Sequence, residues 1–206
     1  FPLRQVRVEG ELRNLAEADF HSVAGRYLGQ NFFVANLDDL SAALAENPWV
    51  EEVSVRRWWP DTVEIRLHER LAFGYWGERE MVDVNGVRFL PTVLRQPGPW
   101  PRLAGPAGHE KALIKIYGEI RALLDPVGLK LVRLVQDDRR AWRLTFDNGL
   151  EVHAGREQFA RRLERLAQVY PRLLAPQVDR IAVVDLRYGN GFAVRWKAER
   201  PAPTAG

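Results

Sequence analysis

The sequence has 206 residues, of which 46% are hydrophobic and 28% charged, and its formal net charge is +3. This composition is typical of a globular chain with one or two domains, and because charges of both signs are interleaved we expect no nucleic-acid partner. The absence of cysteine excludes disulfides and thiolate metal sites, and no apolar run reaches the roughly 18 residues that a membrane span requires.

The chain begins with a predicted strand and a predicted helix. Residues 3–10 alternate imperfectly between apolar and polar side chains and stop at a glycine, which indicates a strand. Residues 14–29 carry apolar side chains at helical spacing. Asn14 can cap the start of this helix, and Gly29 can supply the left-handed residue that ends it.

A second predicted helix and two predicted strands follow. Residues 36–48 again show helical spacing, with Asn36 as the cap. Residues 49–57 and 62–70 alternate cleanly between apolar and polar side chains, and the turn "WWPD" at 58–61 joins them. A three-stranded sheet with one polar face needs a cover on its other face, and the two amphipathic helices can provide it.

The next stretch predicts a hairpin, a loop and a helix. Residues 72–89 contain Asn85-Gly86, which is typical of a type I′ hairpin turn with positive φ at both residues. Residues 91–108 are rich in proline and glycine, so we expect a surface loop there. The apolar spacing in residues 110–126 predicts a helix.

The remaining half of the chain predicts further strands and a last helix. Strands are expected at 129–136 and 141–146, and a tight hairpin at 146–152. Residues 156–174 predict an amphipathic helix, whose arginines we interpret as a solvated face rather than a phosphate-binding surface. The composition of residues 198–206 predicts a disordered tail.

The last β segment, residues 183–196, places its bulky side chains on even positions and its charged ones on odd positions. A two-residue hairpin around Gly189-Asn190 would split the apolar set between two faces. Parity is kept either by a three-residue loop that pairs Tyr188 with Phe192, or by one long strand bent at a glycine bulge. In both arrangements the final strand has a free edge, and its unpaired N–H and C=O groups favour strand addition by a partner.

The sequence shows no catalytic constellation. The four histidines are scattered, the three serines lie outside any nucleophile-elbow motif, and the glycine pairs fit no phosphate-binding spacing. We therefore expect a protein that is not an enzyme and that has no cofactor and no metal site.

Several motifs resemble those of one protein family. The segment "NPWVEEVSVRRWWPDTVEIRLHER" at 47–70 resembles the end of the POTRA domain in the FtsQ/DivIB family of bacterial cell-division proteins. Five motifs resemble its second domain, and they occur in the order "VDVNGVRF", "PRLAGP", "RRAWRLTFDNGLEVHAGR", "RRLERLAQVYPRL" and "VDLRYGNGFAVRW". The resemblance implies an α+β chain with a POTRA domain (β-α-α-β-β) over 1–70. A β-domain of mainly antiparallel strands and two larger helices is then expected over 71–197.

The resemblance also implies partners. In this family the C-terminal strand receives an added strand from FtsB, which is bound to FtsL. Carried over by position, the residues expected to contact FtsB are Tyr188, Gly191, Ala193, Val194 and Trp196, with Arg139 and Arg187 supplying charge to an acidic segment. The POTRA domain implies a further surface around residues 49–67 that faces other division proteins and the membrane.

The family implies a single-pass inner-membrane protein at the division septum, with these residues in the periplasm and an anchoring helix upstream of Phe1. We expect it to be a monomer in isolation and to help control septal cell-wall synthesis. Two alternatives remain: a POTRA scaffold of a protein translocation or outer-membrane assembly machine, and a cell-wall-binding module or hydrolase with a carboxylate cluster in a groove.

Overall fold

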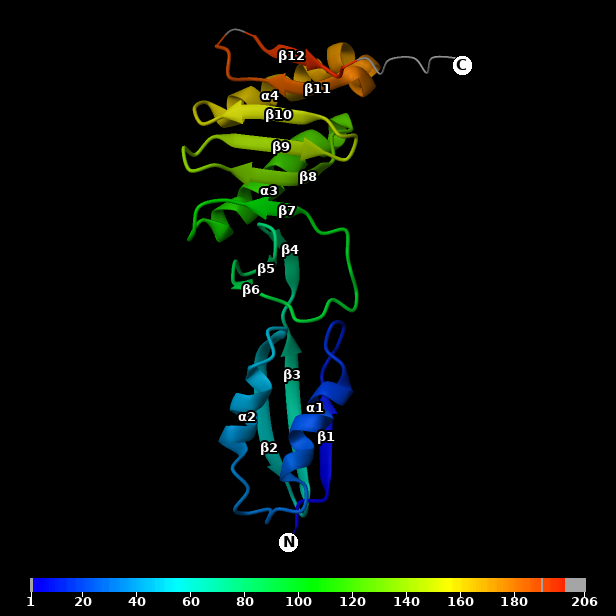
Figure 1. Cartoon of the computed structure of the whole chain (residues 1–206), viewed down its shortest axis with the longest axis vertical. Coiled ribbons are helices and arrows are strands. Elements are labelled where there is room, and N and C mark those ends of the chain that lie inside the picture. The colour runs from blue at the N-terminus through cyan, green and yellow to red at the C-terminus, as the bar shows by residue number, and fades with distance from the viewer. Residues whose placement is uncertain (1, 190, 199–206) are drawn as a thin grey trace, which may run out of the picture. The chain divides into compact units, whose positions relative to one another are not determined.

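The structure is a computed structural model that describes residues 2–189 and 191–198 (Figure 1). Apart from Ala198, the predicted tail lies outside the described residues. Contacts between Cα atoms gather the chain into two compact units. The first unit contains the chain up to Ala72 together with Glu80–Pro99, and the second contains Phe73–Arg79 together with the chain from Trp100 onward. The predicted boundary near residue 70 stays a prediction.

The first unit contains a three-stranded sheet and two helices, and α1 and α2 lie on the same side of the sheet (Figure 1). Its elements are β1 (Gln5–Glu9), α1 (Glu17–Ala24), α2 (Leu37–Ala45), β2 (Val50–Trp58) and β3 (Thr62–Glu69), with a 3₁₀ turn at Gly25–Tyr27. The strand order is β1-β3-β2, with β1 parallel and β2 antiparallel to β3. Alternate residues of β3, Val63, Ile65 and Leu67, are buried, as the alternating pattern predicts. The predicted α+β order is confirmed.

The two predicted helix caps have different outcomes. Asn36 caps α2, because its side-chain oxygen accepts hydrogen bonds from the backbone N–H groups of Asp38 and Asp39 at 3.1 and 3.3 Å. The cap predicted at Asn14 is wrong, since α1 begins three residues later. The backbone N–H and the side-chain amide of Asn14 instead donate to Oε1 of Glu69 at 2.8 and 3.2 Å. This carboxylate lies 55 residues away in sequence. The local sequence pattern therefore could not show that Asn14 binds Glu69 and does not cap the helix.

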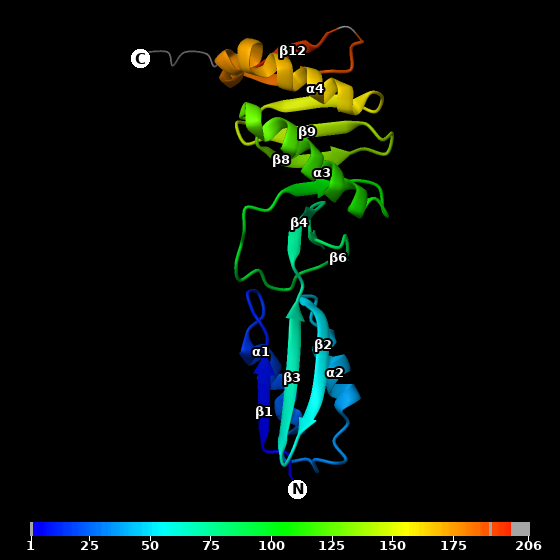
Figure 2. The same ribbon diagram turned by 180° about the vertical axis from the view of Figure 1, so that it is seen from behind.

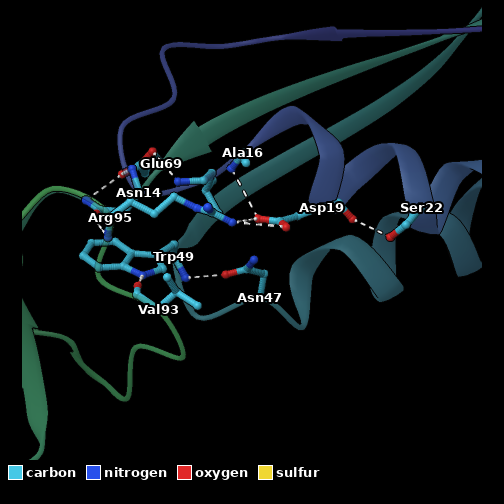
Figure 3. A network of polar contacts seen from close by, with 10 residues as sticks. Asn14, Ala16, Asp19, Ser22, Asn47, Trp49, Glu69, Val93 and Arg95 are labelled. Carbon is cyan, nitrogen blue, oxygen red and sulfur yellow. Dashed lines mark hydrogen bonds and ion pairs between the residues drawn. The ribbon is translucent and has the colours of Figure 1, made fainter.

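A strap formed by residues 91–96 is hydrogen-bonded to the rest of the first unit (Figure 3). Oδ1 of Asn14 accepts the backbone N–H groups of Arg95 and Gln96 at 3.2 and 3.1 Å. The indole N–H of the buried Trp49 donates to the carbonyl of Val93 at 2.8 Å. The strap therefore satisfies buried polar groups of the first unit, as such groups require.

A buried ion pair joins the end of β3 to the following hairpin, which consists of β5 (Glu80–Asp83) and β6 (Arg88–Phe89). Nη1 of Arg70 lies 2.7 Å from Oδ2 of Asp83, whose side chain is only 1% exposed. The other carboxylate oxygen, Oδ1, accepts the backbone N–H groups of Asn85 and Val87 at 2.9 and 2.8 Å. The predicted type I′ turn is wrong: Gly86 has positive φ but Asn85 does not, because the Asp83 carboxylate organises the turn instead.

The second unit is a sheet covered on one face by two helices, α3 and α4 (Figure 2). Its elements are β4 (Ala72–Trp76), β7 (Arg102–Ala104), α3 (Glu110–Leu124), β8 (Leu131–Gln136), β9 (Trp142–Phe146), β10 (Glu151–Gly155), α4 (Phe159–Val169), β11 (Ile181–Asp185) and β12 (Ala193–Trp196), with shorter helical turns at Asp125–Val127, Tyr170–Leu174 and Ala175–Arg180. Within this unit the strand order is β12-β11-β10-β9-β8-β7-β4. The pairs β4–β7, β7–β8 and β10–β11 are parallel, and the pairs β8–β9, β9–β10 and β11–β12 are antiparallel.

Part of the predicted surface loop at 91–108 is a strand inside the sheet, so that prediction is wrong. β7 pairs in parallel with both β4 and β8, and its central residue Leu103 is 1% exposed. The strand is compatible with its proline-rich surroundings because Pro101 precedes it, where a missing N–H removes no bond from the strand's own ladder. Pro101 still contributes its carbonyl, which accepts the N–H of Tyr75 at 2.8 Å.

The Arg70–Asp83 pair generates a prediction about stability. Asp83→Ala leaves the guanidinium of Arg70, whose side chain is 16% exposed, without its carboxylate. We expect the free energy of unfolding to fall by about 3–5 kcal/mol, because a largely buried charge loses its partner. Urea denaturation followed by tryptophan fluorescence measures this change. The control is Glu80→Ala, which removes a half-exposed carboxylate from Arg88 and should cost less than about 1 kcal/mol. Equal losses in the two variants would contradict a structural role for the buried pair.

Candidate functional site

The last strand, β12, lies at one end of the second sheet. It pairs antiparallel with β11, with Val184 opposite Val194 and Asp185 opposite Ala193. Among the described residues no strand lies on the other side of β12. The free edge expected from the sequence is therefore present in the described part of the chain.

The connection between β11 and β12 is longer than either predicted arrangement. β11 ends at Asp185 and β12 begins at Ala193, so Tyr188 and Phe192 do not pair and no single bent strand forms. One reason is that Leu186 is fully buried and its N–H donates to the carbonyl of His153 on β10. The chain leaves β11 through this core position, and the loop starts there. Asn190 lies outside the described residues.

The register shows which main-chain groups of β12 face outward. Leu186 directs its N–H toward β10, so the groups of Val184 also point to β10 and those of Asp185 and Val183 point to β12. The pairs Asp185–Ala193 and Val183–Arg195 are then the hydrogen-bonded ones. Consistent with this alternation, the N–H of Lys197 donates inward to the carbonyl of Arg180 at 2.8 Å. The main-chain groups of Val194 and Trp196 therefore point away from the sheet.

Large side chains border the outward-facing groups. Tyr188 is 58% exposed and Trp196 is 47% exposed, although both are aromatic. The guanidinium of Arg180 lies 5.6 Å from the centre of the Trp196 ring, at a distance that allows a cation–π contact. Phe192 and Val194 are partly buried. An incoming strand would thus meet main-chain donors and acceptors flanked by apolar surface.

Arg187 is already engaged within the molecule. Its Nε and Nη2 atoms donate to the carboxylate of Asp185, with distances from 2.6 to 3.0 Å. These side-chain hydrogen bonds hold the pKa of Asp185 below its ordinary value. The guanidinium remains largely exposed, so it can reach a second carboxylate only beside or in place of Asp185.

Two arginines of α4 hold the loop between β11 and β12, and sequence reasoning missed them. Arg165 donates to the carbonyls of Gly189 and Tyr188 at 3.2 and 3.3 Å. Arg162 donates to the carbonyls of Ala154 and Arg187 at 2.8 and 3.2 Å. The interpretation of this helix face as solvated is therefore wrong at these two positions. Both lie next to buried leucines, Leu163 and Leu166, and that border position was the available signal.

The other predicted site residues lie at different distances from this edge. Ala193 is in β12 opposite Asp185, and Gly191 is in the loop, where it lines an open hollow with Tyr188 and Phe192. Arg139 lies in the turn between β8 and β9, and β9 is three strand steps from β12 in the sheet order. At about 4.8 Å per strand step, the axes of β9 and β12 are roughly 14 Å apart. Only a partner that extends beyond the added strand can reach Arg139, so its assignment stays a prediction.

Comparison with known proteins places the chain in a family. The model described as "Cell division protein FtsQ/DivIB, C-terminal" matches residues 74–187, and the model described as "POTRA domain, FtsQ-type" matches residues 1–70. The chain belongs to the FtsQ/DivIB family. The family resemblance expected from the sequence is confirmed.

Relatives within the FtsQ/DivIB family match almost the whole chain. Proteins named "Cell division protein FtsQ" are 37% identical in Xanthomonas campestris, 31% in Coxiella burnetii and 30% in Vibrio cholerae. These matches cover 97%, 95% and 97% of this chain and 71%, 81% and 76% of the respective relatives. A role in cell division follows from membership in this family.

No described helix is long and apolar enough to cross a bilayer. Within residues 2–189 and 191–198, no group of three or more His, Cys, Asp or Glu side chains is arranged to hold a metal ion.

The Asp185–Arg187 pair generates a prediction about pH. Because the pKa of Asp185 is depressed in the folded state, its contribution to stability is fully present above its unfolded-state pKa of about 3.9. That contribution is lost as pH falls through the lower folded-state pKa. In Arg187→Ala the pKa of Asp185 should return toward its ordinary value, as measured by carboxyl carbon-13 NMR titration. Arg180→Ala serves as the control and should leave the titration unchanged. An Asp185 pKa that is the same in Arg187→Ala and in the wild type would contradict this account.

Proposed function

We propose that this chain is the periplasmic part of a bitopic inner-membrane division protein, and that it acts without catalysis. In this proposal β12 accepts a strand from FtsB, which is bound to FtsL, and the complex helps control septal cell-wall synthesis. The observation that carries the proposal is the outward direction of the main-chain groups of Val194 and Trp196 at an edge where the described residues offer no further strand. Family membership supports the divisome setting.

The backbone and the side chains of this edge are expected to contribute differently to binding. Main-chain pairing supplies affinity for any extended segment, while side chains beside the edge select one partner. Tyr188 and Trp196 are large, exposed and rigid, which is the profile of residues that dominate binding energy at interfaces. Arg187 adds preference for a carboxylate, since its exposed guanidinium can bind one in competition with Asp185.

The comparisons weigh against the alternative of a translocation or outer-membrane assembly scaffold. The POTRA model that matches is the FtsQ type, and the model that matches the rest of the chain is the C-terminal domain of the same family. The cell-wall-binding alternative required a carboxylate cluster in a groove. A hollow of the first unit is lined by Glu11, Glu51 and Glu69, and the Glu69 carboxylate accepts the backbone N–H groups of residues 13–15. This alternative therefore stays open.

The side-chain anchors can be tested by titrating the purified chain with the periplasmic FtsB segment in a calorimeter. We expect Tyr188→Ala and Trp196→Ala each to raise the dissociation constant roughly thirtyfold, the usual effect of removing a dominant aromatic contact. Trp59→Ala is the matched control, because it removes an exposed tryptophan from the first unit and should not change the affinity. Wild-type affinity in both test variants would refute the residue assignment.

The backbone mechanism has a sharper test, which uses adjacent residues of β12. Val194→Pro deletes an outward N–H while leaving the inward pairs of Ala193 and Arg195 intact. FtsB binding should weaken about tenfold or more, with little change in thermal unfolding.

Two control variants separate the main-chain effect from others. Val194→Ala keeps the N–H and should bind nearly as wild type. Arg195→Pro removes an inward donor, so it should destabilise the β11–β12 ladder itself. Equal binding by Val194→Pro and the wild type would exclude strand addition at this edge.

A further inference from the structure

Three segments meet at one end of the first unit and form a surface that we name the arginine–tryptophan tip. The tip consists of residues 2–5, 25–35 and 55–63. The N–H of Leu3 donates to the carbonyl of Gln30 at 2.9 Å, and the N–H of Arg4 donates to the carbonyl of Asp61 at 2.8 Å. These bonds tie the start of the chain to the loop before α2 and to the β2–β3 turn. Figures 1 and 2 both show that turn and that loop at the same end of this unit.

Arg57 fixes the loop before α2 against the end of β2. Its Nε atom donates to the carbonyl of Phe32 at 2.8 Å, and its Nη2 atom donates to the carbonyl of Ala35 at 2.7 Å. Phe32 and Ala35 are buried, so the two residues between them are turned outward. The apolar surface of the tip is therefore held by hydrogen bonds and by packing.

The exposed part of the tip is unusually apolar. Five large hydrophobic side chains are each between 45% and 77% exposed, and they are Leu28, Phe33, Val34, Trp58 and Trp59. Exposed apolar side chains gathered at one end of a unit favour interaction with a protein or a membrane. The two adjacent tryptophans matter most, since tryptophan is enriched at the boundary between hydrocarbon and water in membranes.

The charge of the tip identifies the kind of surface that it fits. The three segments contain four arginines, which are Arg4, Arg26, Arg56 and Arg57, and one acidic residue, Asp61. The resulting formal charge of +3 equals the formal charge of the entire chain. All four residues are exposed. The guanidinium of Arg57 is engaged with the carbonyls of Phe32 and Ala35, whereas those of Arg4, Arg26 and Arg56 can reach phosphate groups.

We propose that the arginine–tryptophan tip binds the surface of an anionic lipid bilayer. Trp58 and Trp59 would enter the headgroup boundary, while the surrounding arginines would pair with lipid phosphates. Apolar side chains and cations together favour such a surface. Burial of the apolar side chains and electrostatic attraction of the cations to anionic lipids both contribute to the binding free energy. This proposal concerns the first unit and does not rest on strand addition at β12.

Vesicle flotation with the purified chain tests the proposal directly. The chain should float with vesicles of phosphatidylethanolamine and phosphatidylglycerol, and much less with vesicles of phosphatidylcholine alone. Raising the ionic strength from about 0.1 M to about 1 M should reduce binding, since the Debye length falls from about 10 Å to about 3 Å. A wild-type chain that floats equally with both vesicle types, or with neither, would overturn the proposal.

Variants assign the binding to the tip. The double variant Trp58→Ser/Trp59→Ser should lower the partition coefficient at least about tenfold and remove the blue shift of tryptophan emission on vesicle addition. Arg56→Gln should lower it about fivefold, while leaving the loop contacts of Arg57 intact. Circular dichroism checks that each variant is folded.

Trp196→Ser is the matched control, because it removes an exposed tryptophan from the second unit. It should bind vesicles as wild type but lose FtsB affinity, whereas the Trp58/Trp59 double variant should do the reverse. Unchanged vesicle binding in the double variant would refute the assignment to the tip, even where FtsB binding behaves as proposed. FtsB binding lost through the double variant would identify the tip as a protein-binding surface instead.

Discussion

A β-sheet that does not close on itself must leave the main-chain groups of its last strand unpaired, and this constraint shapes the second unit. One row of apolar side chains crosses six adjacent strands of that sheet, and its members are Leu103, Leu134, Leu144, Val152, Val184 and Val194. The row is buried as far as Val184 and becomes partly exposed at Val194. Unused hydrogen-bonding capacity and accessible apolar surface therefore coincide at β12, which is the combination that strand addition requires.

The loop beside that edge is positioned by charged groups from neighbouring elements. Arg162 and Arg165 donate to three successive loop carbonyls, those of residues 187–189, and Asp185 orients Arg187. A guanidinium that binds carbonyl oxygens keeps its positive charge beside the loop while it restricts the loop's conformations. Ordering the loop before a partner arrives lowers the entropy cost of binding. The helix α4 thus contributes to the edge without belonging to the sheet.

Local patterns in the sequence predicted the β-α-α-β-β order of residues 1–70 and the alternation of β3, because both depend on neighbours a few residues apart. They also predicted that the last strand has a free edge, whereas Tyr188 and Trp196 were expected as contact residues only from the family resemblance. They failed where a residue distant in sequence decides the local structure. Glu69 binds the donors around Asn14, the partners of β7 come from β4 and β8, and α4 holds the final loop. The direction of each main-chain group in β12 also required the register, which no single segment contains.

The strap at residues 91–96 has a consequence for how the first unit is isolated. A fragment ending at residue 70, where the POTRA match ends, would lack both Asp83 and the carbonyl of Val93. The guanidinium of Arg70 and the indole N–H of Trp49 would then lose these hydrogen-bond partners in largely buried positions. Such a fragment would not have the stability of the intact unit, so a fragment of this unit should extend to Pro99.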